Sequence, residues 1–317
     1  MIDFDRDIAP HRTAVRSYCY RLLGTLSDAD DAAQEALLRA WKAREGFEGR
    51  ASLKTWLFQI ASRVCFDQLS SRKRHSMPDL ERGPSSPTTP TSPDEKIEWL
   101  EPAPDTWLEP QVGPDATIAQ RESIALAFLV ALQALPALQR AVLVLREVLG
   151  HSAIETAEIL ESTVPAVNSA LQRARATLDD SPTAKRPTEE AEQAMLTRYL
   201  EAWTRSDIKA LVSTLREDAS LVMPPMTQWF VGSRNIGTFF SLPFLMAPQA
   251  DASRFKAVAT RAAGCPAIAL FRRAGPDGAW TADSLHVLEV RGDRIGRIAV
   301  WVTPALHPKF GVEQAPQ

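Results

Sequence analysis

Residues 132–178 read LQALPALQRAVLVLREVLGHSAIETAEILESTVPAVNSALQRARATL, and this stretch decides the fold of the middle of the chain. Gly150 ends one predicted helix. Ser152 and Glu155 have the S-x-x-E spacing of a capping box, which begins the next helix. A short turn follows, and Pro165 then stands at a first-turn position where a helix tolerates proline. The pattern predicts helices joined by a short turn.

The apolar and polar residues of these helices separate onto different faces. Inward positions are predicted at Ile154, Ala157, Leu160, Val167, Leu171, Ala174 and Leu178. The polar face of the last helix consists of Asn168, Ser169, Gln172, Arg173 and Arg175. This face is close enough to the helix N-terminus to enter a DNA major groove, as in a helix-turn-helix unit. An ordinary three-helix bundle has the same capping box and apolar stripe, so the spacing alone leaves both interpretations open.

Length and composition bound the rest of the chain. The 317 residues predict about two domains, and 45% hydrophobic with 24% charged residues is ordinary globular composition. No apolar run reaches the roughly 18 residues that cross a bilayer. The N-terminal sequence MIDFDRDIAP lacks the basic start and apolar stretch of a signal peptide. We therefore expect a cytoplasmic protein that does not enter a membrane.

The cysteines and histidines indicate no metal site. The three cysteines are widely spaced, no CxxC motif is present, and the five histidines are scattered. This arrangement favours neither a disulfide framework nor a zinc site. We expect no metal and no cofactor.

Charge and proline content divide the chain into segments. Residues 1–76 carry a net charge of +3, whereas residues 77–120 carry −7 and hold nine prolines. Proline density with acidic charge predicts an extended linker. The predicted organisation is an N-terminal helical domain (1–76), an acidic proline-rich linker (77–120), a helix-turn-helix domain (121–180) and a C-terminal domain (187–317).

Two N-terminal helices are predicted at residues 11–24 and 28–44 from the spacing of their apolar residues. Leu37, Leu38 and Trp41 are predicted to form the apolar face of the second helix. Its first turn, SDADD, offers a Ser or Asp N-cap and places acids where the helix dipole favours them. Helix capping accounts for these acids on spacing alone.

A third helix is predicted over residues 52–72. Basic residues alternate with aromatic ones along it, including Lys54, Trp56 and Arg63. This mixture suits single-stranded nucleic acid, because cations hold phosphates while rings stack on unpaired bases. The same aromatic residues could instead belong to the core.

Two blocks in this order resemble region 2 of extracytoplasmic-function (ECF) sigma-70 sigma factors. They are SDADDAAQEALLRAW (residues 27–41) and FEGRASLKTWLFQIA (residues 47–61). The resemblance implies that the first block docks on the clamp helices of RNA polymerase through Asp28, Asp31, Gln34 and Glu35. It implies that the second block opens the promoter −10 element and holds a flipped base, through Arg50, Ser52, Lys54, Trp56 and Arg63. The family often has Asn at the position of Arg63.

VNSALQRAR (residues 167–175) is similar to the V-x-S-x-L-x-R-A-R pattern that ends sigma region 4. The resemblance places Asn168, Ser169 and Arg173 at positions that read the −35 element. Gln172 and Arg175 share that face, and region 4 is expected to contact the polymerase flap. Asn168 and Ala170 replace residues that are often basic in the family, which implies weaker DNA binding and a shallower salt dependence.

The C-terminal domain begins with a predicted helix (187–204), with Ala194, Leu196, Leu200 and Trp203 inward. Alternating strands follow from residue 254, separated by Gly-rich turns. This order resembles the SnoaL-like (NTF2-like) fold, an α+β cone-shaped barrel. MPPMTQWFVG (residues 223–232) is similar to a motif of sigma factors that carry this domain.

A candidate ligand pocket in this domain consists of Trp203, Met223, Trp229, His286 and Trp301, with core packing as the alternative. Asp283 and His286 are three residues apart and therefore face opposite sides of a strand with period two. We expect no catalytic dyad from them.

The whole chain is predicted to be a multidomain, non-enzymatic transcription initiation factor with two all-α sigma domains and an α+β domain. Its expected partners are core RNA polymerase, promoter DNA and a candidate small molecule in the C-terminal domain. Two alternatives stay open. A SnoaL-class enzyme fused to a DNA-binding adaptor would need convergent titratable groups, and a helix-turn-helix repressor would not need the acidic and TWL helices of region 2.

Overall fold

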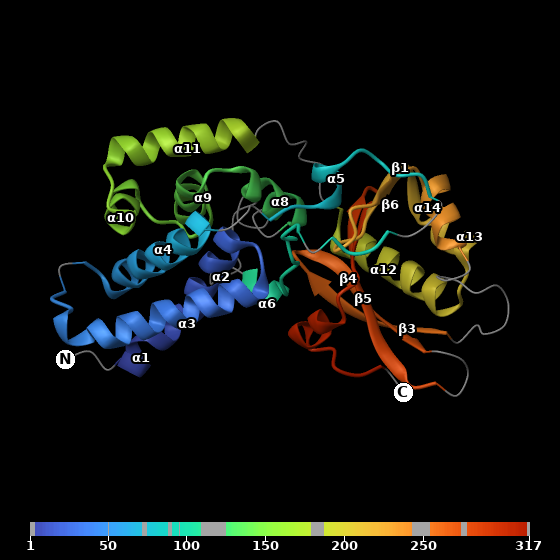
Figure 1. The fold of residues 1–317 in the computed structure, drawn as a ribbon, viewed down its shortest axis with the longest axis horizontal. Coiled ribbons are helices and arrows are strands. Elements are labelled where there is room, and N and C mark those ends of the chain that lie inside the picture. Colours follow the sequence, from blue (N-terminus) through green and yellow to red (C-terminus); the bar gives the residue numbers. More distant parts are fainter. Residues whose placement is uncertain are drawn as a thin grey trace. The chain divides into compact units, whose positions relative to one another are not determined.

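The computed structural model describes residues 4–49, 51–71, 75–87, 91–94, 96–108, 125–178, 187–242, 254–273 and 278–315 (Figure 1). It divides into two compact units. The first unit contains Met1–His75 and Glu98–Pro182, and the second contains Ser76–Ile97 and Thr183–Gln317. Each unit is therefore built from two separate stretches of chain.

The first unit begins with α1 (Phe4–Ile8), η1 (Ala9–His11), α2 (Arg12–Leu23), α3 (Leu26–Ala43), η2 (Arg44–Gly46) and α4 (Leu53–Ser71). The three predicted helices are thus confirmed to within two residues. Tyr18 of α2 packs edge-on against Phe58 of α4, with ring centroids 5.3 Å apart. The predicted Ser27 or Asp cap of α3 is wrong. Thr25 is the N-cap and accepts a hydrogen bond from the Asp28 amide at 3.3 Å, because the helix begins at Leu26.

The same unit continues with α6 (Asp105–Leu108), α8 (Leu126–Ala134), α9 (Ala137–Leu143), the π-helical turn η3 (Val144–Val148), α10 (Ala153–Ile159) and α11 (Val164–Leu178). The capping box is confirmed: the Glu155 amide donates to Ser152 Oγ at 3.1 Å, and the Ser152 amide donates to Glu155 Oε2 at 2.7 Å. It starts α10 at the residue that the sequence indicates.

The inward positions of α11 are mostly confirmed, because Val167, Leu171 and Ala174 are buried. Ile154 is not inward, and its side chain is 64% exposed. The buried side of α10 is formed by Thr156, Ala157 and Ile159. At about 100° per residue, Ile154 faces away from that side.

The second unit combines helices with one sheet. Its helical elements are α5 (Pro78–Glu81), α12 (Glu189–Thr204), α13 (Ile208–Ser213), α14 (Ser233–Phe240) and η4 (Pro304–Phe310). Its strands are β1 (Leu215–Val222), β2 (Trp229–Val231), β3 (Phe255–Ala262), β4 (Cys265–Arg273), β5 (Trp280–Arg291) and β6 (Arg294–Trp301). The strand order is β2-β1-β6-β5-β4-β3, with only β1 and β6 parallel.

The α+β fold predicted for the C-terminal domain is confirmed, but the closed barrel is not. In the described sheet, β2 and β3 are edge strands that do not pair with each other, so the sheet stays open. Its main core contains Trp203 of α12 and Phe240 of α14 together with Phe255 of β3. A smaller core on β4 and β5 contains Phe271 and Leu285, among others.

The inward face of α12 differs in one position from the prediction. Leu196 and Trp203 are buried and Leu200 is partly buried, but Ala194 is exposed. The neighbouring Met195 is buried in its place, together with Tyr199 one turn later. The larger side chains therefore take the core positions, and alanine is left on the solvent side.

The first part of the proline-rich stretch is folded against the second unit. The Ser85 amide donates to the Trp229 carbonyl at 2.7 Å, and the Asp94 amide donates to the Pro225 carbonyl at 3.1 Å. The Thr91 amide donates to Gln228 Oε1 at 2.7 Å. The MPPMTQWFVG motif thus supplies the polar atoms that hold this stretch, for which the proline content predicts an extended linker.

The second part of the stretch is folded against the first unit. Glu101 Oε2 accepts a hydrogen bond from the Leu26 amide at 2.8 Å, and Tyr20 Oη donates to the Glu101 carbonyl at 2.6 Å. Trp107 lies edge-on to Tyr20, with ring centroids 6.5 Å apart, and under the Arg16 guanidinium at 4.1 Å. Trp107 is therefore buried in the first unit.

Candidate functional site

Beyond its first residue, helix α3 buries small side chains and exposes larger ones. Its buried residues are Leu26, Ala29, Ala32, Ala33, Ala36 and Ala40. The prediction that Leu37, Leu38 and Trp41 form its apolar face to the core is wrong for Leu38 and Trp41, which are 45% and 48% exposed, whereas Leu37 is partly buried. Alanine lets α3 pack closely on its neighbours, so the bulky residues are left outside. These exposed apolar groups need a different explanation from packing.

The exposed face of α3 forms one continuous stripe. Asp31, Gln34, Leu38 and Trp41 follow each other at intervals of three or four residues, which places them on one side of a helix. Glu35 is partly exposed beside them and accepts a hydrogen bond from Arg39 Nε at 2.7 Å. We name these five residues, Asp31, Gln34, Glu35, Leu38 and Trp41, the α3 stripe. Three of the four residues expected to contact polymerase belong to it.

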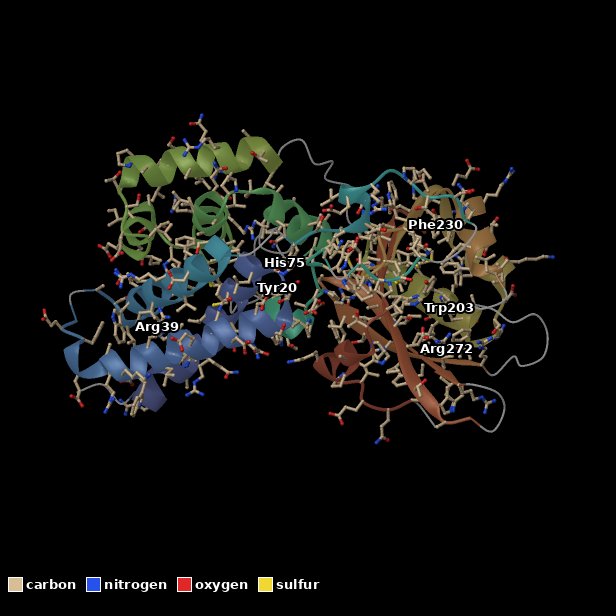
Figure 2. The ribbon with its side chains drawn as sticks, viewed as in Figure 1. Tyr20, Arg39, His75, Trp203, Phe230 and Arg272 are labelled. Carbon is tan, nitrogen blue, oxygen red and sulfur yellow. The ribbon has the colours of Figure 1, made fainter. Side chains whose placement is uncertain are left out.

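Asp28 continues the α3 stripe toward the helix start, three residues before Asp31, but it is more buried than the stripe residues. It is in the first turn of α3, its side chain is 15% exposed, and its Oδ2 lies 3.8 Å from His75 Nε2. His75, labelled in Figure 2, is itself buried and also lies 3.8 Å from Glu98 Oε2. The structure therefore places Asp28 in a partly buried polar cluster at the start of α3.

The expected −10 residues are distributed around α4. Ser52 Oγ accepts a hydrogen bond from the Thr55 amide at 3.0 Å, which is a capping contact at the start of the helix. Trp56 is partly buried against Phe47, with ring centroids 4.8 Å apart. Arg63 is exposed and shares a face with Trp56 at two turns' distance. Arg50 lies outside the described residues.

Lys54 is on the opposite side of α4 from Arg63, because nine residues at about 100° each bring the helix to the far face. Its charge helps to lower the pKa of His151 to about 4, although burial of that imidazole is the larger cause. His151 packs edge-on against Phe58, with ring centroids 5.2 Å apart. Lys54 is partly buried and thus lies on the side of α4 toward His151, not on the Trp56 and Arg63 face.

The expected −35 residues are all exposed on α11, namely Asn168, Ser169, Gln172, Arg173 and Arg175. Arg173 Nη1 donates to Ser169 Oγ at 2.6 Å, which orders two of these side chains side by side. Arg175 forms an ion pair with Glu147 of η3. The face therefore presents polar donors along one exposed side of α11, as a helix in a DNA major groove does.

The candidate pocket residues of the second unit do not converge. Trp203 and His286 are buried in contact, with ring centroids 5.1 Å apart, and Met223 is buried in the same core. Trp301 is paired with Leu285, one residue from His286, and so belongs to the other face of the sheet. Trp229 directs its Nε1 to the Arg82 carbonyl at 2.7 Å. The pocket set is therefore split among three environments.

A buried polar chain runs through His286. Its Nδ1 is 2.9 Å from Tyr199 Oη, and its Nε2 is 2.9 Å from Ser284 Oγ. Ser284 Oγ also lies 3.0 Å from Asp283 Oδ2, and Asp283 pairs with Arg272 at 3.0 Å. Asp283 and His286 do not touch, as the strand period predicts, and Ser284 bridges them at an irregularity of the β4–β5 register.

Comparison with known proteins identifies the family to which the chain belongs. Residues 8–75 match the family model "Sigma-70 region 2", and residues 125–178 match "Sigma-70, region 4". The ECF RNA polymerase sigma factor SigG of Mycobacterium tuberculosis (strain H37Rv) is 38% identical over 316 residues, which cover 98% of this chain and 84% of SigG. The chain belongs to the ECF sigma factor family.

Further ECF sigma factors extend this likeness. SigW of Bacillus subtilis is 27% identical over 172 residues, 53% of this chain and 82% of that protein. The crystal structure of the M. tuberculosis ECF sigma factor SigJ aligns with a TM-score of 0.64 at 21% identity, over 98% of this chain and all of SigJ. That alignment shows a shared fold along the whole chain, including the C-terminal unit.

ECF sigma factors are non-enzymatic transcription initiation factors that bind core RNA polymerase and promoter DNA, and region 4 is a DNA-binding region. In the described part of this sigma factor, no group of three or more His, Cys, Asp or Glu side chains is arranged to hold a metal ion. Within the same residues, no helix is both long and apolar enough to cross a membrane.

Sequence reasoning on this sigma factor missed two features of the site. The exposure of Leu38 and Trp41 was signalled by the five alanines on the opposite side of α3, which are enough to form a helix contact. The docking of Glu101 on the start of α3 had a weaker signal, the tryptophans on either side of it. Neither signal identifies the segment that packs on these residues. Only the fold does.

Buried His286 makes the stability of the second unit depend on pH. Burial lowers the pKa of His286 to about 3, and the nearby His307 adds to the effect. In the unfolded chain this pKa is about 6.5, so below pH 6.5 only the unfolded state gains a proton. Stability present above pH 6.5 is therefore lost as the pH falls toward the folded pKa, by about 2 kcal/mol at pH 5.

We expect His286→Gln to remove this part of the pH dependence while keeping polar atoms toward Tyr199 and Ser284. The measurement is urea unfolding at pH 7.5 and pH 5.0, followed by pulsed hydrogen exchange of peptides from β5. The wild type should lose about 2 kcal/mol more than His286→Gln between the two pH values. Equal losses in both proteins would show that His286 is not the group responsible.

Proposed function

We propose that this sigma factor directs core RNA polymerase to promoters with −35 and −10 elements and opens the DNA at −10. We further propose that its C-terminal unit modulates that activity. The observation that carries the proposal is the α3 stripe, in which acids and an amide accompany two large exposed apolar side chains on one helix face. Large apolar side chains that can be buried by a partner, accompanied by polar groups, are typical of a protein interface.

The α3 stripe is assigned to the polymerase clamp, with Asp31, Gln34 and Glu35 as its polar contacts. The polymerase flap is assigned to region 4. Ile154 of α10 and Leu138 of α9 support this second contact, because they are 64% and 44% exposed within an otherwise well-packed helical region. Two separated contacts on one large partner raise overall affinity without requiring either to be strong alone.

The −10 element is assigned to the face of α4 that carries Trp56 and Arg63. The indole of Trp56 is partly exposed beside Phe47 and offers a surface on which an unpaired base can stack. Arg63 lies on the same face and is exposed. A ring for a base next to a cation for a phosphate favours single-stranded over paired DNA, which supports opening of the duplex there.

The −35 element is assigned to α11. Asn168, Ser169 and Arg173 are exposed on one face of α11, and recognition helices place such a face in the major groove. Arg175 is paired with Glu147, which neutralises its charge. Few cations remain for phosphate contacts, so we expect weak DNA binding by region 4 and dependence on polymerase for stable promoter contact.

The C-terminal unit is assigned its modulating role through its contacts with the linker between regions 2 and 4. Arg297 of β6 holds Asp79 of α5 through two hydrogen bonds, Nη1 to Oδ2 at 2.6 Å and Nη2 to Oδ1 at 3.0 Å. Residues 76–97 follow region 2 directly in the chain and are folded with the C-terminal unit. The unit therefore restrains the segment that joins region 2 to region 4, and so influences how far these regions can separate.

The test of promoter opening uses the reconstituted holoenzyme. We expect Trp56→Ala to abolish permanganate reactivity of −10 thymines, while core polymerase still binds the variant. Trp56→Phe, which keeps a stacking ring, should retain most of the reactivity. Arg173→Ala should reduce promoter occupancy at both elements. Full −10 opening by Trp56→Ala would contradict the assignment of that element to α4.

A further inference from the structure

The turn between α10 and α11 contacts α4 through a single carboxylate. Glu161 Oε1 accepts a hydrogen bond from Gln59 Nε2 at 2.9 Å. Glu161 Oε2 accepts from Arg63 Nε at 3.3 Å, and Arg63 Nη2 pairs with Oε1. One anionic group is thus held by an amide and a two-pronged guanidinium from the same helix face.

This donor set is suited to a phosphate group. A guanidinium presents its donors in a planar fork that fits two oxygens of a carboxylate or a phosphate equally well. Gln59 adds a neutral donor one turn away, a kind of contact that proteins commonly make to nucleic-acid backbones. In the structure, the carboxylate of Glu161 fills the position that two phosphodiester oxygens would take.

The backbone of Glu161 gives an independent reason to look for a role of its side chain. Its φ is +49°, in the left-handed region that non-glycine residues adopt at a cost of about 1 kcal/mol. Gly or Asn would make this turn with less strain. The turn geometry therefore does not account for a glutamate here, whereas the contact of its carboxylate with Gln59 and Arg63 does.

We propose that Gln59 and Arg63 form a binding site for a backbone phosphate of the −10 strand, and that Glu161 occupies this site in the free chain. The proposal rests on the assignment of the −10 element to α4. Trp56, Gln59 and Arg63 follow at i, i+3 and i+7, so a base on the ring and its phosphate on the other two groups lie along one face. Phosphate and Glu161 compete for the same donors.

The contact of Glu161 with Arg63 is weak enough for a phosphate to replace it. Arg63 and Glu161 are 56% and 52% exposed in their side chains, and exposed ion pairs of this kind are weak and screened by salt. The rest of region 4 is held on region 2 independently. Buried Arg140 donates to the Leu22 carbonyl, and Gln133 Nε2 donates to the Arg21 carbonyl at 3.4 Å. Removal of Glu161 therefore vacates the phosphate site without undocking region 4.

The test measures binding of a fluorescein-labelled, mixed-sequence single strand of about 20 nucleotides to the full chain in about 50 mM salt, by anisotropy. We expect Glu161→Ala to tighten binding about two- to five-fold, the range that an exposed ion pair allows. Gln59→Ala and Arg63→Ala should weaken binding. The double variant Glu161→Ala/Arg63→Ala should bind no better than Arg63→Ala, because Glu161 acts only through the donors it covers.

The matched control is Glu158→Ala. Glu158 is an exposed acid of α10, three residues before Glu161, and its removal changes the net charge by the same amount. Tighter binding by Glu161→Ala than by Glu158→Ala supports the proposal. Equal binding by these two variants overturns it, as does wild-type binding by both Gln59→Ala and Arg63→Ala.

The same variants in the permanganate assay separate this inference from the proposed function. If Arg63→Ala abolishes −10 opening but Glu161→Ala leaves oligonucleotide binding at the Glu158→Ala level, α4 reads the −10 element and the competition by Glu161 is refuted. If Glu161→Ala tightens binding while Arg63→Ala opens promoters normally, the phosphate site stands and its assignment to the −10 strand is refuted.

Discussion

Replacement of Asp79 by alanine is expected to release residues 76–94 from the C-terminal sheet. Asp79 and Arg297 are 18% and 16% exposed. Burial lowers the pKa of Arg297, but the hydrogen bonds to Asp79 and the charges of Glu289 and Asp79 outweigh this effect, so the pKa is raised. Loss of Asp79 leaves a largely buried guanidinium with Glu289 Oε1 at 3.7 Å as its nearest remaining acid. Breaking such a pair costs about 3 kcal/mol or more.

Hydrogen exchange of the linker amides measures this release. The amides of Ser85, Thr91 and Asp94 donate to Trp229, Gln228 and Pro225, and they should exchange roughly 100-fold faster in Asp79→Ala if about 3 kcal/mol is lost. Glu81→Ala is the control, because Glu81 is an exposed acid of the same short helix. Equal protection in Asp79→Ala and wild type would show that Arg297 does not hold the linker.

Apolar replacement of both partners extends this test. Asp79→Leu combined with Arg297→Met removes both charges of the pair, and Glu289 keeps Arg291 at 3.8 Å as a partner. Much of the protection should therefore return. If transcription by the holoenzyme changes in Asp79→Ala and returns toward wild type in the double variant, modulation follows attachment of the linker. Unchanged transcription in a variant with a released linker would contradict the modulating role proposed for the C-terminal unit.

Trp41→Ala is expected to weaken binding to core RNA polymerase about 30-fold. The indole is 48% exposed, and the Arg44 guanidinium stacks over it at 4.3 Å, which limits its motion before binding. A rigid aromatic residue at the centre of an interface commonly contributes about 2 kcal/mol when it is truncated, and this corresponds to the expected factor. The measurement is a titration of labelled chain with core polymerase.

Leu80→Ala is the matched control for this effect. Leu80 is 49% exposed, close to the 48% of Trp41. It belongs to α5, however, and not to the α3 stripe. Leu38→Ala should weaken binding in the same direction as Trp41→Ala, and Leu80→Ala should leave it unchanged. Equal affinities for Trp41→Ala and Leu80→Ala would remove the α3 stripe as the polymerase contact.

The parts of the fold that follow from local pattern were predictable from the sequence. The Ser152 capping box and the apolar stripe of α11 depend only on residues close together along the chain, and both are confirmed. The face of α3 was not predictable in the same way. A helix can pack on alanines as well as on leucines, and the choice depends on how closely its neighbours approach.

Contacts between distant segments were beyond sequence reasoning. The proline-rich stretch lacks the composition for a core of its own, yet its amides find acceptors on the motif around Trp229. Likewise, the relation of His286 to Trp301 depends on the β5–β6 register, which pairs Trp301 with Leu285. A residue type shows what a side chain can bind, but register and docking decide what it meets.

Size-exclusion chromatography of the chain with core RNA polymerase tests whether the chain is a polymerase-binding initiation factor. We expect the wild type to co-elute with core polymerase, and Asp31→Lys, which reverses a charge in the exposed α3 stripe, to elute apart from it. Asp28→Asn, at the partly buried cluster with His75, should be less damaging to the complex than Asp31→Lys. Elution of the wild type apart from core polymerase would contradict the account.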